Sequence, residues 1–225
     1  MTPMVDRPSE WSVNGWRVAG VVLGERNVAS CQDRAAFVPI EGGLVVTVAD
    51  GAGGRGGGAE AANAVVSEVG AASLAAPGDL WRADYWVEVL RRVDTKIAAA
   101  HHGGESTAVV LALGRQIVGA SVGDSAAWLL GPSGIVDLTG GQHRRPMIGS
   151  GSAAIAPVVG EVDSSPVLVA SDGFMKYASR TRVAATRIDS NLSGAVSGLV
   201  DVVRLRSGAL QDDVTVVLCR REEQP

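Results

Sequence analysis

The stretch from Leu44 to Ala64 constrains this chain more than any other, because it joins a buried strand to a helix through an acid and a run of glycines. Residues 44–48 are apolar apart from one threonine and mostly β-branched, a pattern typical of a buried strand. Asp50 follows this strand, six glycines fall within residues 51–58, and helix-forming composition runs from Ala59 to Gly70. Glycine frees the backbone for turns that side chains forbid. The stretch therefore predicts an acid offered from a strand end to a metal ion or a phosphate group.

A nucleotide-binding interpretation competes for the same glycines. Residues 51–56 match the G-x-G-x-x-G pattern of dinucleotide-binding folds. That fold needs a second parallel strand soon after the helix, with an acid for the ribose, whereas Pro77-Gly78 and a second helix follow here. The phosphate-loop pattern fails because no Gly-Lys-Ser/Thr closes the run. The dinucleotide interpretation is therefore weak, and failure to bind NAD or ATP would exclude it.

Composition limits the class of protein. With 225 residues, the chain can form one well-packed domain; we expect it over residues 13–221, after a polar tail over residues 1–12. A net charge of −4 without a basic run argues against a nucleic-acid partner. No apolar stretch approaches the roughly 20 residues that span a bilayer, and the first ten residues lack a signal-peptide core. Cys31 and Cys219 form no metal-type spacing and no disulfide framework. We expect a cytoplasmic monomer without a membrane anchor.

Periodicity predicts an alternation of strand and helix groups. Further strands are expected over Trp16 to Gly24 and Ala35 to Ile40, the latter paired with residues 44–48 as a hairpin across a Gly-Gly turn. A second helix is expected over Leu80 to Ala100. The remaining expected elements are an antiparallel meander over residues 106–113, 116–121 and 126–130, a surface flap over 140–160, a strand over 166–170, a helix over 192–205 and a strand over 214–219.

Acids recur at the margins of these strands. A single such acid has an ordinary explanation, because Asp is a common turn former. Five recurrences, three of them followed or preceded by Gly, are harder to explain in that way. Oxygen-rich clusters suit the hard cations Mg²⁺ and Mn²⁺, whereas three histidines and two isolated cysteines fit zinc poorly. The five positions are Asp33, Asp50, Asp124, Asp172 and Asp212.

These positions carry a resemblance. Residues 50–54, DGAGG, resemble the D-G-x-G-G motif of the metal-dependent protein phosphatases, the protein phosphatase 2C (PPM) family. Five other segments stand in that family's order, and the resemblance spans residues 20–220. Gln32-Asp33 resembles its N-Q-D or E-D element, residues 104–108 its G-S/T-T-A strand start, residues 123–125 its G-D-S motif, residues 171–173 its S-D-G motif and residues 212–215 its D-N/D-x-T motif.

The resemblance implies a fold and a chemistry. The fold is α+β, a four-layer α/β/β/α sandwich of two antiparallel sheets flanked by helix pairs, and the hairpin, consecutive helices and short connections expected above agree with it. The activity is hydrolysis of phosphoserine or phosphothreonine in a phosphoprotein, by a hydroxide that bridges two Mn²⁺ or Mg²⁺ ions. The partner is then a phosphorylated protein, with the enzyme opposing a Ser/Thr kinase.

The resemblance also implies a role for each acid. Asp50 bridges both ions, with the Gly51 carbonyl as a further ligand. Asp172 and Asp212 hold the second ion, and Asp33 supports the waters of the first. Asp124 belongs to a third, looser ion site found in bacterial members, and Asp213 stands where most members have Asn.

The chain departs from the family pattern at the phosphate-binding arginine. Members usually carry it shortly before the N-terminal element; Arg26 lies there at an unusual spacing from Asp33, and Arg34 and Arg55 are substitutes. Each is equally explained as a solvated loop charge. The basic run at residues 143–145 either recruits an anionic phosphoprotein or is an ordinary basic loop. The rival hypothesis is a catalytically weak or inactive module that binds a phosphoprotein partner and regulates signalling.

Overall fold

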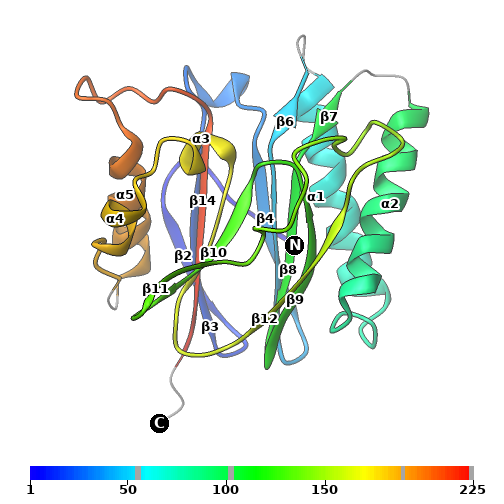
Figure 1. Ribbon diagram of the computed structural model, residues 1–225, viewed down its shortest axis with the longest axis horizontal. Coiled ribbons are helices and arrows are strands. Elements are labelled where there is room, and N and C mark those ends of the chain that lie inside the picture. Colours follow the sequence, from blue (N-terminus) through cyan, green and yellow to red (C-terminus); the bar gives the residue numbers. More distant parts are fainter. Residues whose placement is uncertain (54–56, 101–103, 189–190, 223–225) are drawn as a thin grey trace.

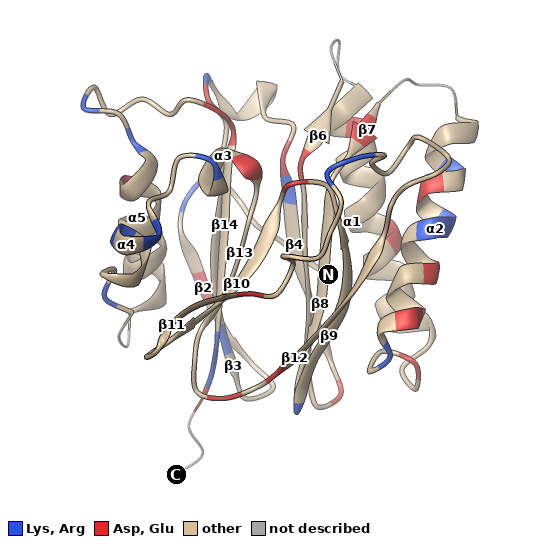
Figure 2. Cartoon of the chain, viewed as in Figure 1, with Lys and Arg blue, Asp and Glu red and all other residues tan. Residues whose placement is uncertain are grey.

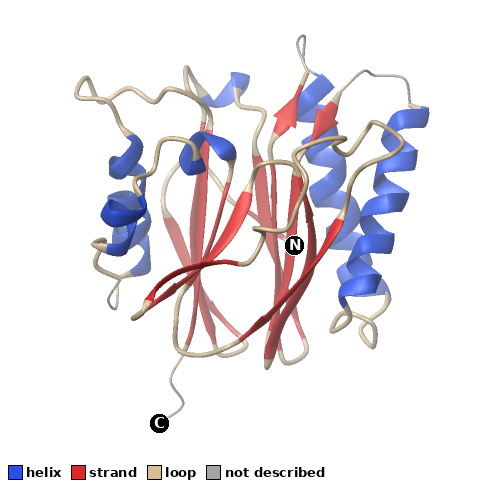
Figure 3. Ribbon diagram, viewed as in Figure 1, coloured by secondary structure: helices blue, strands red, loops and turns tan. Residues whose placement is uncertain are grey.

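Two six-stranded antiparallel sheets face each other in the computed structural model of the chain, and helices cover both outer faces (Figures 1 and 3). The structure describes residues 1–53, 57–100, 104–188 and 191–222. The first sheet has the strand order β1-β4-β5-β8-β9-β12, and the second has the order β11-β10-β13-β14-β3-β2. The expected α+β class and the four-layer α/β/β/α sandwich are both confirmed.

The bounds of the elements follow the expected ranges closely in the sheet centres. The first sheet comprises β1 (Thr2–Pro3), β4 (Arg34–Ile40), β5 (Gly43–Ala49), β8 (Ala108–Leu113), β9 (Gln116–Val122) and β12 (Ala156–Glu161). The second comprises β2 (Ser9–Val13), β3 (Trp16–Leu23), β10 (Ala126–Gly131), β11 (Gly134–Asp137), β13 (Val167–Ala170) and β14 (Val214–Arg221). A separate pair is formed by β6 (Gly51–Ala52) and β7 (Glu105–Ser106). The helices are α1 (Gly57–Ala75), α2 (Ala83–Ala99), α3 (Asp172–Met175), α4 (Arg180–Ala184) and α5 (Leu192–Val203), with a 3₁₀ turn at Val28–Ser30.

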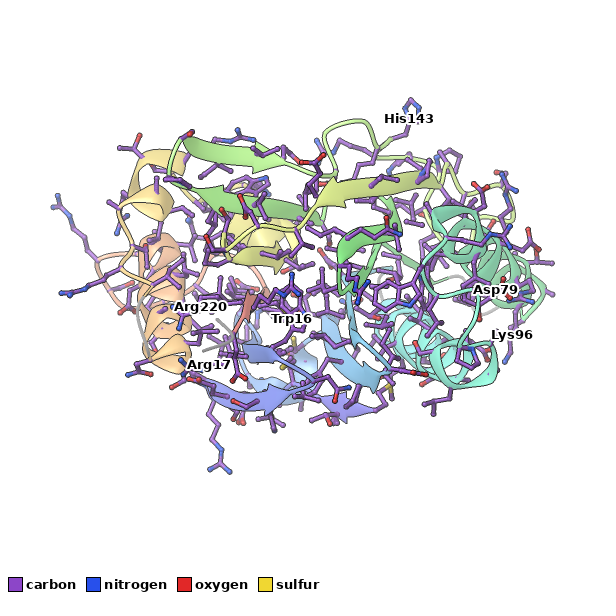
Figure 4. The ribbon with its side chains drawn as sticks, turned by 90° about the horizontal axis from the view of Figure 1, so that it is seen from below. Trp16, Arg17, Asp79, Lys96, His143 and Arg220 are labelled. Atoms are coloured by element: carbon purple, nitrogen blue, oxygen red, sulfur yellow. The ribbon has the colours of Figure 1, made fainter. Side chains whose placement is uncertain are left out.

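Three hydrophobic layers hold the sandwich together. One lies between the first sheet and the pair α1 and α2, and another lies between the second sheet and α5. The third fills the space between the sheets, where Trp16 lies near the middle of the molecule (Figure 4). Because both faces of β5 are covered, all seven of its residues are buried, which explains why this strand reads as a continuous apolar run.

The alanines and small residues of α1 explain how that helix approaches the sheet. Ala61 and Ala62 are buried beside Val65 and Val69, so little side-chain bulk separates α1 from β4 and β5. On α2 the apolar stripe includes Trp86, Leu90 and Val93. The indole of Trp86 is fully buried, and its Nε1 donates to the carbonyl of Leu80 over 2.9 Å. The buried polar end of this side chain is therefore satisfied.

Three expectations about the chain path are wrong. Residues 1–12 are not a tail: β1 pairs with β4 in the first sheet, and β2 pairs with β3 in the second. Their polar look comes from edge strands with one solvated face. The meander also fails, because β9 pairs with β8 whereas β10 pairs with β11 and β13 in the opposite sheet. Finally, the expected flap ends in a strand, since β12 pairs with β9.

No helix within the described ranges is long and apolar enough to cross a membrane.

Candidate active site

Strand ends from both sheets bring the five expected acids to one edge of the sandwich. Asp50 follows β5 and Asp172 follows β13, while Asp33 precedes β4 and Asp212 precedes β14. In antiparallel neighbours the end of one strand lies beside the start of the next, so these positions share an edge. Figure 2 shows acidic and basic segments gathered along this upper edge of the two sheets. Asp124 joins them because it lies in the turn that crosses from β9 to β10.

Four of the acids line a depression of about 530 Å³ at this edge. Asp33 lies close by but is only 1% exposed. The depression therefore brings together four of the five acids that the sequence predicts to share a site, and Asp33 is buried next to Asp50. Its lining residues are Asp50, Ala52, Thr107, Asp124, Arg144, Arg145, Met147, Asp172 and Asp212.

Asp50 is held through its backbone, which leaves its carboxylate available. Its N–H donates to Thr107 Oγ1 over 3.0 Å, and its carbonyl accepts from Thr107 N over 2.9 Å and from Ser106 Oγ over 3.1 Å. Thr107 Oγ1 also lies 2.7 Å from Ser125 Oγ, next to Asp124. The start of β8 therefore fixes Asp50 relative to the β9–β10 turn. The sequence motif over residues 104–108 includes Ser106 and Thr107, the two residues that make these hydrogen bonds. The motif did not identify Thr107 as a residue that lines the depression.

Glycines allow the backbones at this edge to approach each other. A Cβ added at Gly51 would lie 2.2 Å from the carbonyl oxygen of Gly58, and one added at Gly173 would lie 1.9 Å from that of Asp213. These approaches pack the start of α1 against the residue after Asp50, and the residue after Asp172 against the start of β14. The two Asp-Gly pairs therefore need their glycines for packing.

Asp33 is buried with half of its hydrogen-bonding capacity unused. Its Oδ2 accepts from Thr215 Oγ1 over 2.8 Å, whereas Oδ1 has no hydrogen-bond partner among the described residues. Thr215 N in turn donates to Ser171 Oγ over 2.9 Å. A buried carboxylate oxygen without a partner is costly, so the environment of Asp33 fits a cation or a water molecule bound to one.

The pKa values of the acids at this edge also support a cation site. Burial raises the pKa of Asp50, and the charges of Asp33 and Asp172 raise it further. Burial also raises the pKa of Asp33, and burial together with Asp124 and Asp212 raises that of Asp172. These carboxylates raise one another's pKa more than the nearby cations lower it, although Lys176 lowers the pKa of Asp172. Divalent cations would supply further positive charge.

The donor set fits ions that retain water. Within the described ranges no group of three His, Cys, Asp or Glu side chains is arranged to hold an ion by itself. Mg²⁺ usually keeps several waters and takes only one or two carboxylates from the protein. The residues therefore fit hydrated hard cations and not a closed structural metal site.

The structure does not bring the expected arginines to the depression. Arg26 is an exposed loop residue whose Nε lies 3.8 Å from Glu25 Oε2. Arg34 turns toward its own loop and α1, where it donates to the carbonyls of Cys31 (2.9 Å) and Asp33 (2.7 Å) and to Asn63 Oδ1 (2.8 Å). Arg55 lies outside the described residues. Spacing along the chain could not show which way these side chains point.

The cations that do line the depression are Arg144 and Arg145. Arg144 Nε donates to Asp124 Oδ2 over 3.1 Å, and Arg145 Nη1 donates to Glu105 Oε2 over 3.1 Å. His143, from the same basic run, points outward at the margin of the molecule (Figure 4). Asp124, expected at a third ion site, is thus paired with a guanidinium group.

Asp213 closes a loop instead of facing the depression. Its Oδ1 accepts from the N–H of Glu25 over 2.8 Å, and its Oδ2 accepts from that of Gln32 over 2.7 Å. Both ends of the loop over residues 25–32 are thereby fixed to the start of β14. Asp213 therefore positions Asp33 indirectly, through the segment that precedes it.

Comparison with protein families decides the assignment. A family description for protein phosphatase 2C matches residues 25–187, which is most of the chain. The chain belongs to the protein phosphatase 2C family. Members of this family are metal-dependent protein serine/threonine phosphatases, so the chain is an enzyme of that class, as its sequence motifs predicted.

Solved structures share the fold of this phosphatase at low sequence identity. A bacterial serine phosphatase carrying one substitution superposes with a TM-score of 0.80 at 17% identity, covering 91% of this chain and 98% of the other. A serine/threonine phosphatase of S. agalactiae gives 0.78 at 20% identity, with 92% and 100% covered. The catalytic domain of PstP in complex with two manganese ions gives 0.74 at 20% identity, with 92% and 99% covered. Comparison with curated protein sequences found no significant match.

The raised acid pKa values predict how the stability of the metal-free phosphatase depends on pH. The folded protein holds protons that the unfolded chain releases. The free energy of unfolding therefore falls as the pH rises from 3.8, the ordinary pKa of Asp, through about 6, the pKa of folded Asp33. In EDTA we expect a lower unfolding temperature at about pH 7.5 than at about pH 5, and a smaller difference with Mn²⁺ because the ion binds the deprotonated acids. An unfolding temperature in EDTA that rises over this interval would contradict the interpretation.

The cysteines of the phosphatase are expected to be unreactive in the native state. Burial and the charges of Asp33 and Asp213 raise the pKa of Cys31 to about 12, and burial raises that of Cys219 to about 12. The thiolate is the reactive form, so a thiol reagent at about pH 8 should label neither residue until denaturant is added. Rapid labelling of the native protein would show that one thiol is more open than the structure indicates.

Proposed function

We propose that this phosphatase is catalytically competent and hydrolyses phosphoserine or phosphothreonine in a phosphoprotein at the acid-lined depression. The observation that carries the proposal is the depression lined by Asp50, Asp124, Asp172 and Asp212, with the buried Asp33 carboxylate beside Asp50 and one Asp33 oxygen without a hydrogen-bond partner among the described residues. Such a cluster is unfavourable by itself and favourable around divalent cations.

The residues have distinct parts in this proposal. Asp50 and the Gly51 carbonyl would hold a first Mn²⁺ or Mg²⁺ ion. Asp50 would be shared with a second ion that Asp172 and Asp212 would hold partly through water, because these acids do not by themselves form an ion site among the described residues. When bound, two such ions lower the pKa of a shared water and neutralise charge on the phosphoryl oxygens. Thr107 fixes the backbone of Asp50, and Asp33, which accepts from Thr215 Oγ1, would support the waters of the first ion. Asp124 forms an ion pair with Arg144, so a third ion would have to compete with Arg144 for this carboxylate.

None of the described lining residues is left free to act as a nucleophile in this scheme, because Asp50, Asp172 and Asp212 would bind the ions and Asp124 is paired with Arg144. The lining residues include a threonine, Thr107, but its hydroxyl is engaged with Asp50 N and Ser125 Oγ. Direct attack by water on phosphorus is therefore favoured over a covalent phospho-enzyme. Peptide-borne phosphate can reach the open depression, which supports a phosphoprotein substrate and an opposing Ser/Thr kinase.

The proposal is tested by phosphate release from phosphothreonine and phosphoserine peptides with Mn²⁺, with Mg²⁺ and with EDTA. We expect saturable turnover with either ion and none in EDTA. Binding of Mn²⁺ and peptide without turnover would favour the rival hypothesis of an inactive phosphoprotein-binding module. Turnover that persists in EDTA would exclude the metal-dependent mechanism.

A further inference from the structure

Two guanidinium groups lie on the rim of the acid-lined depression, and both come from the basic run over residues 143–145, for which the sequence left open phosphoprotein recruitment or an ordinary loop. Among the described residues that line it, Arg144 and Arg145 are the cations and the other charged residues are acids. Both belong to the segment between β11 and β12. A phosphoryl group that enters the depression must therefore meet these arginines and the four aspartates.

The ion pairs that now occupy these arginines are weak enough to be exchanged. The side chains of Arg144 and Arg145 are 77% and 71% exposed, whereas those of their partners Asp124 and Glu105 are 27% and 32% exposed, so water reaches each pair from the arginine side. Pairs as exposed as these contribute little to stability because water screens them. A phosphoryl dianion carries more charge than a carboxylate and accepts the two parallel hydrogen bonds of a guanidinium group. It would therefore compete well for both arginines.

The backbone beneath these side chains is held at both ends. The carbonyl of His143 accepts from Gly123 N over 2.9 Å, and Ile148 exchanges two backbone hydrogen bonds with Ser106, of 2.8 and 3.0 Å. Beyond Ile148, the buried carboxylate of Asp94 accepts from the N–H groups of Gly149, Gly151 and Ala153. The arginines are thus exposed side chains on an anchored backbone, which limits the ordering cost of binding.

We propose that Arg144 and Arg145 bind the phosphoryl group of the substrate by exchanging their ion pairs with Asp124 and Glu105 for the phosphoryl oxygens. The inference rests on the proposed function, because it names the residues that bind substrate at the same site. They would bind the substrate phosphate in place of Arg26 and Arg34, which do not line the depression. Arg144 would also couple phosphate binding to Asp124, which is freed when the arginine moves.

The test compares Arg144→Gln and Arg145→Gln with the matched control Arg82→Gln. Arg82 lies outside the depression, is 66% exposed and pairs with Asp79 over 3.1 Å, the distance of the Arg145–Glu105 pair. With Mn²⁺ present, each rim variant should raise the KM for a phosphothreonine peptide and the inhibition constant of inorganic phosphate by about tenfold or more. The effect on kcat should be smaller, and Arg82→Gln should leave all three constants unchanged.

The outcomes separate this inference from the proposed function. If the wild-type protein turns over peptide and the rim variants behave like Arg82→Gln, the arginine inference is overturned while the phosphatase proposal stands. If the wild type shows no turnover, the phosphatase proposal fails, and calorimetric binding of inorganic phosphate to the Mn²⁺-loaded protein decides the arginine inference. Weaker phosphate binding by both rim variants supports it, and equal binding overturns it.

Discussion

Replacing Asp50 with Asn is expected to reduce Mn²⁺-dependent hydrolysis of a phosphothreonine peptide by more than about 100-fold. Partners that only support a metal ligand typically contribute about 10- to 100-fold in affinity or activity, and Asp50 is proposed to contact both ions directly. Asn keeps the size of the side chain and removes its charge. The measurement is kcat/KM with saturating Mn²⁺ for the variant and the wild type.

The same variant has an opposite effect on the stability of the metal-free protein, which serves as its control. Burial and the charges of Asp33 and Asp172 raise the pKa of Asp50 to about 10, so at neutral pH folding of the metal-free wild type requires this side chain to take up a proton, a cost that Asn avoids. In EDTA at neutral pH we expect Asp50→Asn to unfold at a higher temperature than the wild type. An inactive variant that also unfolds at a lower temperature would indicate a damaged fold, and a variant with near-normal activity would contradict the role given to Asp50.

Replacing Asp94 with Ala is expected to lower the free energy of unfolding by about 3 kcal/mol or more. Asp94 is 4% exposed, and its carboxylate accepts from three backbone N–H groups over 2.7 to 2.9 Å. Alanine would leave these donors without their acceptor, and each unsatisfied buried donor costs about 1 to 3 kcal/mol. Because the anchored segment follows Arg144 and Arg145, peptide hydrolysis should also weaken. Chemical denaturation measures the stability change.

A surface acid on the same helix provides the comparison for Asp94. The side chain of Glu88 is 57% exposed and lies 3.9 Å from Arg91. Glu88→Ala should change the free energy of unfolding by less than about 0.5 kcal/mol. If Asp94→Ala is equally mild, the segment over residues 149–153 does not depend on this carboxylate, contrary to its hydrogen bonding.

The sequence predicted the acid cluster because strand ends are visible in it. Each buried apolar run marks a strand, and an acid directly after or before the run must lie at an edge of the sheet. The motifs around Asp50 and Asp172 also contain the glycines that permit close backbone approach. The positions of the acids were therefore available from local pattern and motif order, before any side-chain geometry.

The chain path between the sheets was not visible in the same way. The turn at residues 123–125 reads as a hairpin turn, yet the chain crosses there from the first sheet to the second. The edge strands over residues 2–3 and 9–13 are short and half solvated, so they resemble a tail. Local composition describes whether a segment is extended and does not fix which strand it pairs with.

Side-chain direction explains the remaining differences. Arg34 was a reasonable candidate by position, but it is used to hold the loop before β4. Asp94 gave a signal that was overlooked, since it falls on the apolar stripe of α2 beside Leu90 and Val93. An acid on a buried helix face must have partners. Here those partners come from a segment about 55 residues further along the chain, which no local pattern reveals.

The most direct test of the account is a count of the Mn²⁺ ions bound by the purified protein, by calorimetry or equilibrium dialysis, with and without Asp172→Asn. The account predicts two ions per chain with the ion pair between Arg144 and Asp124 intact, and loss or marked weakening of one of them in the variant. A wild-type protein that binds no Mn²⁺, or a variant that binds it unchanged, would contradict the central claim that these strand-end acids form a two-ion site.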